Sequence, residues 1–190
     1  AKETGLQLSS LEAEVFSMTR SLPANDKETT MVMLDIGAQT TTINIIDQGV
    51  LKLSHSFDVS GNDFTQNISK SLQVEYKEAE YFKRKYGIKK KGKAIRKVLL
   101  PRIDLITMEI QKIARRYREK EGQDIQKVLL GGGTALMPGL KSYLAEELTQ
   151  KVEVIKPFSD LYYPSILENR LERLGPSFAV AVGLGIRGLQ

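Results

Sequence analysis

A short segment between two apolar stretches carries residue types that suit phosphate binding: Asp35, Gly37, Gln39, Thr40 and Thr41. A tight turn at the end of a strand exposes successive backbone N–H groups, and such a concavity suits phosphate oxygens. Gly37 allows close approach of a ligand because it lacks a Cβ, and the two threonines offer hydroxyl donors. The Asp35 carboxylate is a candidate ligand for Mg²⁺ or its water shell. On this motif alone, a plain β-turn with an aspartate is an equally good interpretation.

A glycine run, Gly131-Gly132-Gly133-Thr134, follows a second apolar stretch. Three glycines are more than a strand needs in order to end, and they suit a flat ligand that presses against the backbone. The alternative is a permissive connection between a strand and a helix. The run is therefore a second candidate for ligand contact, and it is the stronger of the two as an isolated motif.

A third candidate lies on a predicted helix, where Glu80 and Lys83 are three residues apart and Gly87 follows. Residues at this spacing share one face of a helix, and a glycine at its end is a common stop signal. Taken alone, a surface ion pair explains the two charged residues better than a ligand site does.

Composition excludes several other kinds of site. The chain of 190 residues has no cysteine, which excludes disulfides and thiolate metal sites. Its single histidine, His55, excludes a His-cluster metal site and leaves no plausible Ser/His/Asp triad. The sequence contains neither the G-x-x-x-x-G-K-[ST] nor the G-x-G-x-x-G pattern. No secretory signal opens it, and no apolar run approaches the ~20 residues needed to cross a bilayer.

The formal net charge is +5, and part of the excess lies in the run Lys89-Lys90-Lys91-Gly92-Lys93. Arg96 and Lys97 follow it closely. We favour a solvated loop or helix end here over contact with anionic lipid or nucleic acid. The aromatic residues Tyr81, Phe82 and Tyr86 follow a helical pattern, so they indicate core packing rather than a platform for stacking bases.

Hydrophobic periodicity predicts the elements that position these residues. Strands are expected at 30–34, 43–46, 50–57, 124–130 and 152–155. Helices are expected at 8–22, 64–72, 76–86, 95–120, 138–148 and 178–186. Pro101 should bend the long helix or mark its first turn, and the segments 23–29 and 157–174 are expected to be irregular. Three sequential strands followed by crossovers predict an α/β lobe with a mixed sheet.

All three candidate segments occur in the order typical of the actin/Hsp70-like ATPase superfamily. The D-I-G-x-x-T-T segment at 35–41 resembles its second phosphate-binding loop, and G-G-G-x-A-L-x-P-G-L at 131–140 resembles its adenosine loop. Glu80-x-x-Lys83 followed by Gly87 resembles the helix that contacts ribose and adenine. The coincidence of the three segments is far more specific than any one of them.

A narrower resemblance is to the PilM family of type IV pilus assembly proteins, which are relatives of the cell-division protein FtsA. Segment 11–17 resembles the family's helix before the second phosphate loop. Segment 60–65 resembles G-G-N-x-[FL]-T, 78–84 resembles E-A-E-x-x-K-[RK], and 179–188 resembles the closing A-x-x-x-G-L-x-x-R-G. The resemblance covers nearly the whole chain, from residue 5 to residue 189, and the segments at 60–65 and 78–84 favour the pilus branch over FtsA.

Two residues depart from the family pattern. Gln39 stands where the family usually has Gly or Ser, so phosphate contact there is expected to use the backbone N–H group. Thr42 stands where Asp is common, which changes the hydrogen bonding beside the phosphates.

The family's first phosphate loop, D-[IL]-G-x-x-x-[IV]-K, and its inserted small subdomain are not found in this sequence. The chain begins at Ala1 with a predicted helix, so we expect a fragment that lacks the first phosphate-loop lobe. The resemblance implies an actin-like (ribonuclease H-like) α/β lobe with a mixed sheet and flanking helices. Residues 1–29 would form the edge of the first lobe and 30–190 the second lobe, with 62–123 mainly helical and 175–190 a closing helix.

The resemblance implies an ATP- and Mg²⁺-binding protein of type IV pilus assembly. It would be cytoplasmic and peripheral to the inner membrane, as part of an alignment subcomplex. Its expected partner is the cytoplasmic tail of an inner-membrane pilus protein, bound through the full-length protein. Self-association is a further expectation, whereas nucleic acid is not expected and membrane contact would be indirect.

With one wall of the ATP cleft absent, we expect weak binding of ATP and no hydrolysis. An FtsA-like scaffold, or another ATPase or kinase of the superfamily, is the alternative.

Overall fold

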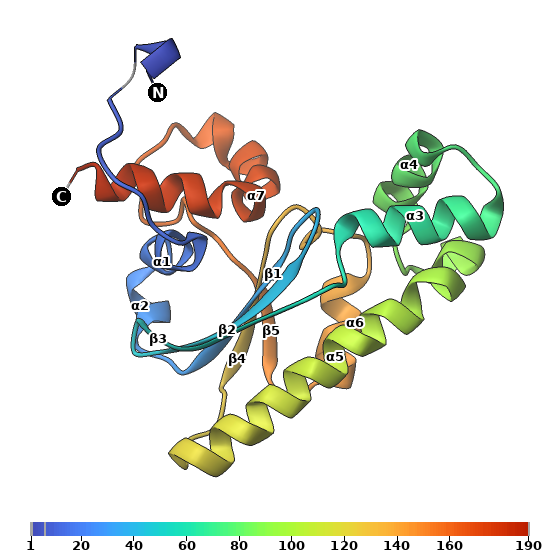
Figure 1. Ribbon diagram of the computed structural model, residues 1–190, viewed down its shortest axis with the longest axis horizontal. Helices are drawn as coiled ribbons and strands as arrows, with labels where there is room; N and C mark the ends of the chain where they lie inside the picture. The colour runs from blue at the N-terminus through green and yellow to red at the C-terminus, as the bar shows by residue number, and fades with distance from the viewer. Residues whose placement is uncertain (1, 6, 190) are drawn as a thin grey trace.

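The computed structural model describes residues 2–5 and 7–189 of the chain. At its centre is a five-stranded mixed sheet with the strand order β3-β2-β1-β4-β5 (Figure 1). β1 and β2 are antiparallel, as are β2 and β3, while β4 and β5 run parallel to β1. The strands are β1 (Met31–Ile36), β2 (Thr41–Asp47), β3 (Val50–Phe57), β4 (Lys127–Gly131) and β5 (Lys151–Val154). The predicted hairpins and crossovers are therefore confirmed.

Helices cover both faces of this sheet (Figure 1). α1 and α7 lie over one face, and α5 and α6 lie over the other, while α3 and α4 extend beyond the sheet. The helices are α1 (Glu14–Arg20), α2 (Ala24–Lys27), α3 (Gly61–Leu72), α4 (Tyr76–Tyr86), α5 (Lys93–Glu121), α6 (Leu140–Glu147) and α7 (Glu168–Arg187). Short 3₁₀ turns are η1 (Lys2–Thr4), η2 (Lys90–Gly92) and η3 (Ser165–Leu167).

The alternation of side chains along β1 explains why both faces must be covered. Val32 and Leu34 belong to the core beneath α3, α5 and α6, whereas Met31 and Met33 belong to a second core beneath α1 and α7. All four side chains are fully buried. Successive side chains of a strand point to opposite faces, so a central strand that is apolar throughout requires a layer on each side.

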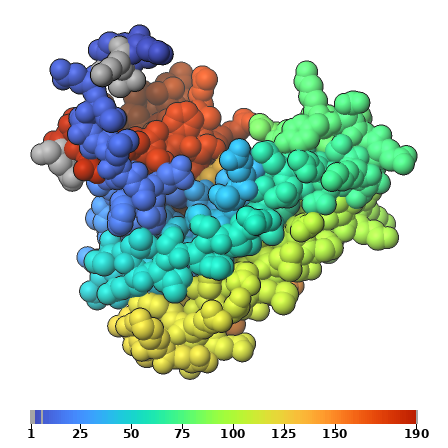
Figure 2. Space-filling model, viewed as in Figure 1, coloured from blue at the N-terminus to red at the C-terminus, as the bar shows by residue number. Residues whose placement is uncertain are grey.

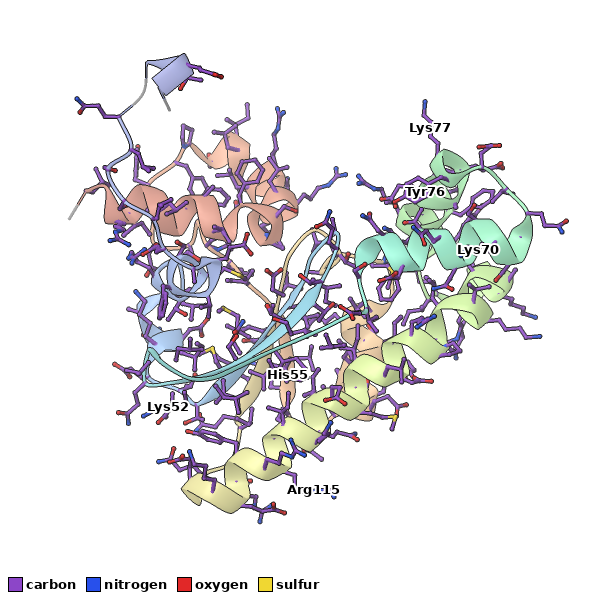
Figure 3. The ribbon with its side chains drawn as sticks, in the orientation of Figure 1. Lys52, His55, Lys70, Tyr76, Lys77 and Arg115 are labelled. Atoms are coloured by element: carbon purple, nitrogen blue, oxygen red, sulfur yellow. The ribbon has the colours of Figure 1, made fainter. Side chains whose placement is uncertain are left out.

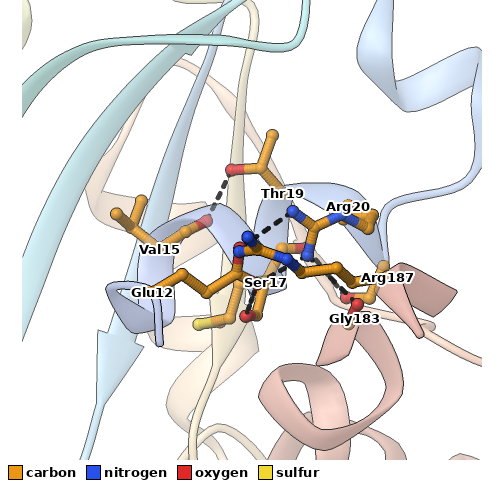
Figure 4. A network of polar contacts seen from close by, with 9 residues as sticks. Glu12, Val15, Ser17, Thr19, Arg20, Gly183 and Arg187 are labelled. Atoms are coloured by element: carbon orange, nitrogen blue, oxygen red, sulfur yellow. Dashed lines mark hydrogen bonds and ion pairs between the residues drawn. The ribbon is translucent and has the colours of Figure 1, made fainter. Parts of the chain in front are cut away.

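The contact between α1 and α7 joins residues from opposite ends of the chain (Figure 4). Glu12 accepts hydrogen bonds from Arg20, at 2.6 and 3.0 Å, from Ser17 and from Arg187 of α7. Hydrogen bonds from Arg20, Ser17 and Arg187 lower the pKa of the Glu12 carboxyl to about 2, against a smaller rise from burial. Gly183 packs directly on the backbone of Ser17, where a Cβ atom would lie 1.8 Å from the carbonyl oxygen.

Several helix boundaries differ from the predictions. The helix expected at 8–22 is shorter, because Leu8 and Leu11 are 65% and 81% exposed and therefore supply no buried face. The loop expected at 23–29 contains α2, which begins directly after Pro23. Of the two alternatives predicted for Pro101, a bend or the first turn of the helix, the second is wrong, since α5 begins at Lys93 and runs through Pro101. Pro101 lies on the exposed side, where water can satisfy the carbonyl group that loses its partner.

The largest difference concerns α7, which begins at Glu168 rather than near Phe178. The segment expected to be irregular therefore supplies the first seven of the twenty residues of this helix. Pro176 lies inside it, and a proline removes one helical hydrogen bond. The carbonyl group left without that bond belongs to Glu172, an exposed residue, so the helix continues through the proline.

Candidate functional site

The three predicted segments meet at one pocket of about 800 Å³, at the carboxyl ends of β1 and β4. Helices α3, α4 and α7 complete its wall, and in Figure 2 the tip of the β1–β2 hairpin reaches the surface between α7 and the green helices. Half of the predicted residues line the pocket: Gly37, Glu80, Lys83, Gly132, Gly133 and Thr134. The other half lie behind or beside the lining: Asp35, Gln39, Thr40, Thr41, Gly87 and Gly131.

The turn between β1 and β2 is fixed by backbone hydrogen bonds to α3, whereas N–H groups at its tip remain free. Gly37 donates its N–H to the Thr40 carbonyl at 3.0 Å, which closes the turn. The carbonyl groups of Gly37 and Ala38 accept hydrogen bonds from the first two residues of α3, Gly61 and Asn62, at 2.9 and 3.0 Å. In the described part of the chain, the N–H groups of Ala38 and Gln39 have no acceptor. The turn therefore presents free amide donors on a fixed support, which suits an anion.

The polar side chains of this turn take different roles. Thr40 and Gln39 are exposed at or beside the tip. Thr41 is fully buried on β2, and its hydroxyl donates to the Val59 carbonyl, so that hydroxyl serves the fold in this structure.

Gly61, which was not among the predicted site residues, lies where the three segments come closest. A Cβ atom on Gly61 would lie 2.8 Å from Thr134 Oγ1 and 3.2 Å from the Gly37 carbonyl oxygen. Any side chain at this position would fill the floor of the pocket. Ser60 caps α3 by accepting the Asp63 N–H at 3.2 Å, which fixes the start of the helix beside the pocket. The signal in the sequence was the Ser-Gly-Asn-Asp pattern before an apolar helix.

Glu80 and Lys83 form a buried network that joins α4 to α3. Lys83 Nζ donates to Glu80 Oε2 at 2.7 Å, to Thr65 Oγ1 at 2.9 Å and to the Gly61 carbonyl at 2.8 Å. Lys83 is only 8% exposed, and its ammonium group uses all three of its donors in these contacts. Lys83 therefore holds the amino end of α3, whose amides in turn hold the hairpin turn.

The Glu80 carboxylate is satisfied on both oxygens. Besides Lys83, it accepts from Thr65 at 2.5 Å and from Arg84 Nε at 2.7 Å. Burial raises the pKa of Glu80, but the hydrogen bonds from Lys83, Thr65 and Arg84 outweigh burial and lower the pKa to about 2. The carboxylate is thus charged at every physiological pH.

Asp35 lies in the opposite situation at the end of β1. Burial, and to a smaller degree the charge of Glu14, raises the pKa of its carboxyl group to about 6. No ion pair with Asp35 occurs among the described residues. Its carboxylate lies against Gly132, where a Cβ atom would approach Asp35 Oδ1 to 2.3 Å. A buried carboxyl group without a cation favours binding of one.

Close packing requires glycine at one position of the run, Gly132, whereas Gly131 lies against a flexible side chain. Gly132 has φ +83° and donates its N–H to the Pro176 carbonyl of α7 at 3.0 Å. Gly131 packs on Met18 of α1, leaving 2.5 Å between its would-be Cβ and the Met18 methyl group. Gly133 is exposed on the pocket wall. The run thus ties β4 to both helices of one face, while Gly132 and Gly133 line the pocket.

Gly87 does not line the pocket but joins α4 to the loop after the glycine run. It has φ +49°, and a Cβ atom there would lie 2.3 Å from the Pro138 carbonyl oxygen. Ile88 donates its N–H to the same oxygen at 2.9 Å. Gly87 therefore fixes the position of α4 relative to that loop.

Further lining residues are not among the predicted site residues, although two of them share α4 with Glu80 and Lys83. Tyr76, at the start of α4, is 45% exposed and donates its hydroxyl to Asn62 Oδ1 at 3.0 Å (Figure 3). Arg84 and Arg173 add positive charge, and Arg173 comes from the part of α7 that was expected to be irregular. The pocket thus combines a flat aromatic ring, cationic groups and free backbone amides.

The described residues contain no cluster of three or more His, Cys, Asp or Glu side chains arranged for a metal ion. His55 lies on the edge strand β3, with Nε2 at 3.7 Å from Glu109 Oε2, and is not part of the pocket. In the described part of the chain, no helix is both long and apolar enough to cross a membrane.

Comparison with known proteins gives a family and a fold. The family model described as type IV pilus assembly protein PilM matches residues 6–189. The cell division protein FtsA of Pseudomonas aeruginosa is 24% identical over an alignment that covers 100% of this chain and 49% of that protein. FtsA of Staphylococcus epidermidis is 26% identical over 44% of this chain and 18% of that protein.

Solved structures agree with this result. The structure of the PilM–PilN type IV pilus biogenesis complex superposes with a TM-score of 0.87 and 26% identity, covering 100% of this chain and 55% of that chain. MreB5 of Spiroplasma citri bound to ADP superposes with a TM-score of 0.75 and 21% identity, covering 97% and 61%. The chain spans about half the length of the proteins it matches. It belongs to the type IV pilus assembly protein PilM family and has the actin-like ATPase fold.

Proposed function

We propose that the pocket binds ATP with Mg²⁺ as one wall of a nucleotide cleft, in a protein that serves type IV pilus assembly. The observation that carries this proposal is the convergence of three elements on one pocket: a turn with free amides, a glycine run and the α4 wall. A volume of about 800 Å³ falls within the range of ~300–1,000 Å³ that is usual for small-ligand sites.

The residues present fit such a ligand. The Ala38 and Gln39 amides, with the Thr40 hydroxyl, would hold phosphate oxygens, and Gly132 and Gly133 would allow the nucleoside close to the backbone. We assign Glu80 and Lys83 to the wall that faces the nucleoside, where their mutual hydrogen bonds hold the wall in shape.

Asp35 is the carboxylate that would hold Mg²⁺, directly or through water. Mg²⁺ commonly uses one or two carboxylates together with substrate phosphates and water, so a single aspartate suffices. The ion would neutralise phosphate charge. We expect no turnover from these residues alone, because phosphoryl transfer needs charge neutralisation and positioning around the whole transferred group.

The descriptions of similar proteins support both the proposed nucleotide ligand and the proposed role in pilus assembly. MreB5 is described as bound to ADP, and the structural relative in the pilus system is a complex with PilN. We infer that the protein containing this chain binds the cytoplasmic tail of an inner-membrane pilus protein and lies at the cytoplasmic side of that membrane. The FtsA matches favour a cell-division scaffold as the second candidate, which ATP-dependent pelleting would reveal.

Calorimetric titration of ATP into the chain, with and without Mg²⁺, tests the site. Asp35→Asn should weaken binding of ATP–Mg²⁺ by about tenfold and leave Mg²⁺-free binding unchanged, because one charged ligand to the ion is lost. The matched control is Asp58→Asn, which neutralises an exposed aspartate between β3 and α3. Equal affinities for the wild type and Asp35→Asn would remove the metal role, and absence of binding at millimolar ATP would remove the proposed nucleotide site.

A further inference from the structure

The positive charge of the chain is concentrated in one region. Residues 61–104, which include α3, α4, η2 and the start of α5, contain twelve Lys and Arg residues against five Asp and Glu residues. This region therefore has a formal net charge of +7, while the whole chain has +5. The sheet and the helices α1, α2, α6 and α7 are consequently close to neutral or slightly acidic. Such an asymmetry indicates an electrostatic contact on the helical region.

Five lysines at the junction of α4 and α5 form what we term the basic tip: Lys89, Lys90, Lys91, Lys93 and Lys97. All five are exposed, and none lines the nucleotide pocket. Among the described residues, none of them has a carboxylate within ion-pair distance. Some exposed lysines elsewhere do have such partners, as Lys112 has with Glu109 and Lys151 with Glu153. The positive field of the basic tip is thus not cancelled locally.

The basic tip is held by the fold rather than carried on a loose loop. Ile88, directly before it, is fully buried, and its carbonyl accepts a hydrogen bond from Arg96 of α5 at 2.5 Å. Gly92 packs on Tyr86, since a Cβ atom at Gly92 would lie 2.6 Å from the Tyr86 Cβ. The 3₁₀ turn is closed by the Gly92 N–H donating to the Lys89 carbonyl at 3.0 Å. The lysines are therefore displayed together at little further cost in backbone entropy.

The chemistry of the basic tip favours an anionic lipid surface over nucleic acid. All five cations are lysines, whereas base recognition in nucleic acids relies mainly on the forked guanidinium group of arginine. Of the aromatic residues before the basic tip, Phe82 and Tyr86 pack against the core. Tyr81 is exposed, but Lys85 Nζ lies over its ring at 5.1 Å from the ring centroid. Clusters of four to eight basic residues on a surface are typical of contact with anionic headgroups.

We propose that the basic tip docks on the headgroup phosphates of an anionic bilayer and so orients the protein at the membrane surface. This contact is independent of the nucleotide pocket, and it would be direct rather than through a membrane-protein partner.

Flotation of the full chain with lipid vesicles tests the proposal. Phosphatidylethanolamine vesicles are compared with and without phosphatidylglycerol, at low and high salt. The test variant replaces four lysines of the basic tip with glutamine: Lys89, Lys90, Lys91 and Lys93. The matched control replaces four exposed lysines from other parts of the chain: Lys112, Lys120, Lys141 and Lys151. Both variants lose the same net charge, and circular dichroism melting confirms that each is folded.

We expect the wild type to bind only the vesicles with phosphatidylglycerol, and to be released by high salt. The affinity of the test variant should fall at least about tenfold, and that of the control no more than about twofold. Equal losses in the two variants would show that only total charge matters and would overturn the proposal. Absence of wild-type binding at low salt would do the same. Tighter binding to an oligonucleotide or to polyglutamate than to vesicles would also overturn the proposal, because it would identify that polymer as the partner of the basic tip.

Discussion

Two carboxylates beside the same pocket have opposite environments. Glu80 accepts hydrogen bonds from Lys83, Thr65 and Arg84, and its pKa falls to about 2. Asp35, at the end of β1, is partly buried and has no cation beside it among the described residues; burial and, to a smaller degree, the charge of Glu14 raise its pKa to about 6. In the α3–α4 wall, the charge of Glu80 is thus balanced by protein groups without any ligand. At the end of β1, an added cation would stabilise the charge of Asp35.

The two carboxylates therefore have different roles: Glu80 stabilises the fold, whereas Asp35 is suited to ligand binding. A satisfied buried network stabilises the fold, so its loss should appear mainly in the free energy of unfolding. An unpaired buried carboxylate costs stability and is retained at sites where a ligand compensates for it. Substitutions on the two sides should therefore change stability in opposite directions.

Lys83→Met should give the largest effect. It leaves the Glu80 carboxylate and the Gly61 carbonyl without their shared donor in a nearly buried position, which should lower the free energy of unfolding by about 2–3 kcal/mol. Urea unfolding measures this change. Lys77→Met, on the exposed side of the same helix, is the control and should leave the urea midpoint unchanged. A loss below about 0.5 kcal/mol for Lys83→Met would show that the network does not hold α3 to α4.

Asp35→Asn should stabilise the free protein at pH 7.5, by about 1–2 kcal/mol, because it removes a buried charge without a partner. A raised pKa in the folded state means that the folded protein binds more protons than the unfolded chain between pH ~3.8 and ~6. The contribution of Asp35 to stability is thus fully present below pH ~3.8 and is lost as pH rises through ~6.

Thermal unfolding of the wild type and Asp35→Asn across pH 3.5–8 checks that sign. The two proteins should converge near pH 4 and separate as the pH rises. The gain in stability should accompany the weaker ATP–Mg²⁺ binding predicted above. A wild type that is more stable than Asp35→Asn at pH 7.5 would contradict the environment assigned to Asp35.

Arg84→Gln should give the smallest effect. Arg84 contacts Glu80 Oε1 at 2.7 Å, but the Arg84 side chain is 79% exposed, and surface ion pairs contribute only about 0.2–0.5 kcal/mol. The change in unfolding free energy should remain within that range and disappear in high salt. A loss comparable to that of Lys83→Met would mean that the outer oxygen of Glu80 matters as much as the buried one.

The sheet was predictable because its strands carry local signals. The turn Asp47-Gln48-Gly49 marks the β2–β3 hairpin, and β1 and β4 are short apolar runs before glycine-containing segments. Helix α7 was predicted only in its second half. Its first half, 168–175, is mostly exposed and precedes Pro176, so neither periodicity nor propensity marks it as helix. The contacts that position this segment come from residues distant in the chain, since Gly175 packs on Pro157 and the Pro176 carbonyl accepts a hydrogen bond from the Gly132 N–H at 3.0 Å.

The site was predictable as three motifs but not as a contact surface. Gly37, Glu80 and the glycine run carry recognisable patterns, while Tyr76 of α4 and Arg173 of α7 belong to none of these motifs. The use of Lys83 within the fold was also unpredictable, since an i, i+3 pair gives no information about a third partner such as the Gly61 carbonyl. Such partners depend on how α3 and α4 are placed side by side.

The packing of α7 on α1 has a consequence for how the chain folds as it is synthesised. The apolar side chains of Met31 and Met33 are made early, but the helix that completes their cover includes Ala179 and Gly183 near the end of the chain. Until α7 leaves the ribosome, that face of the sheet remains open to water and to other nascent chains. The Arg187–Glu12 contact therefore forms only after α7 has been synthesised, and truncation within α7 should yield an aggregation-prone intermediate.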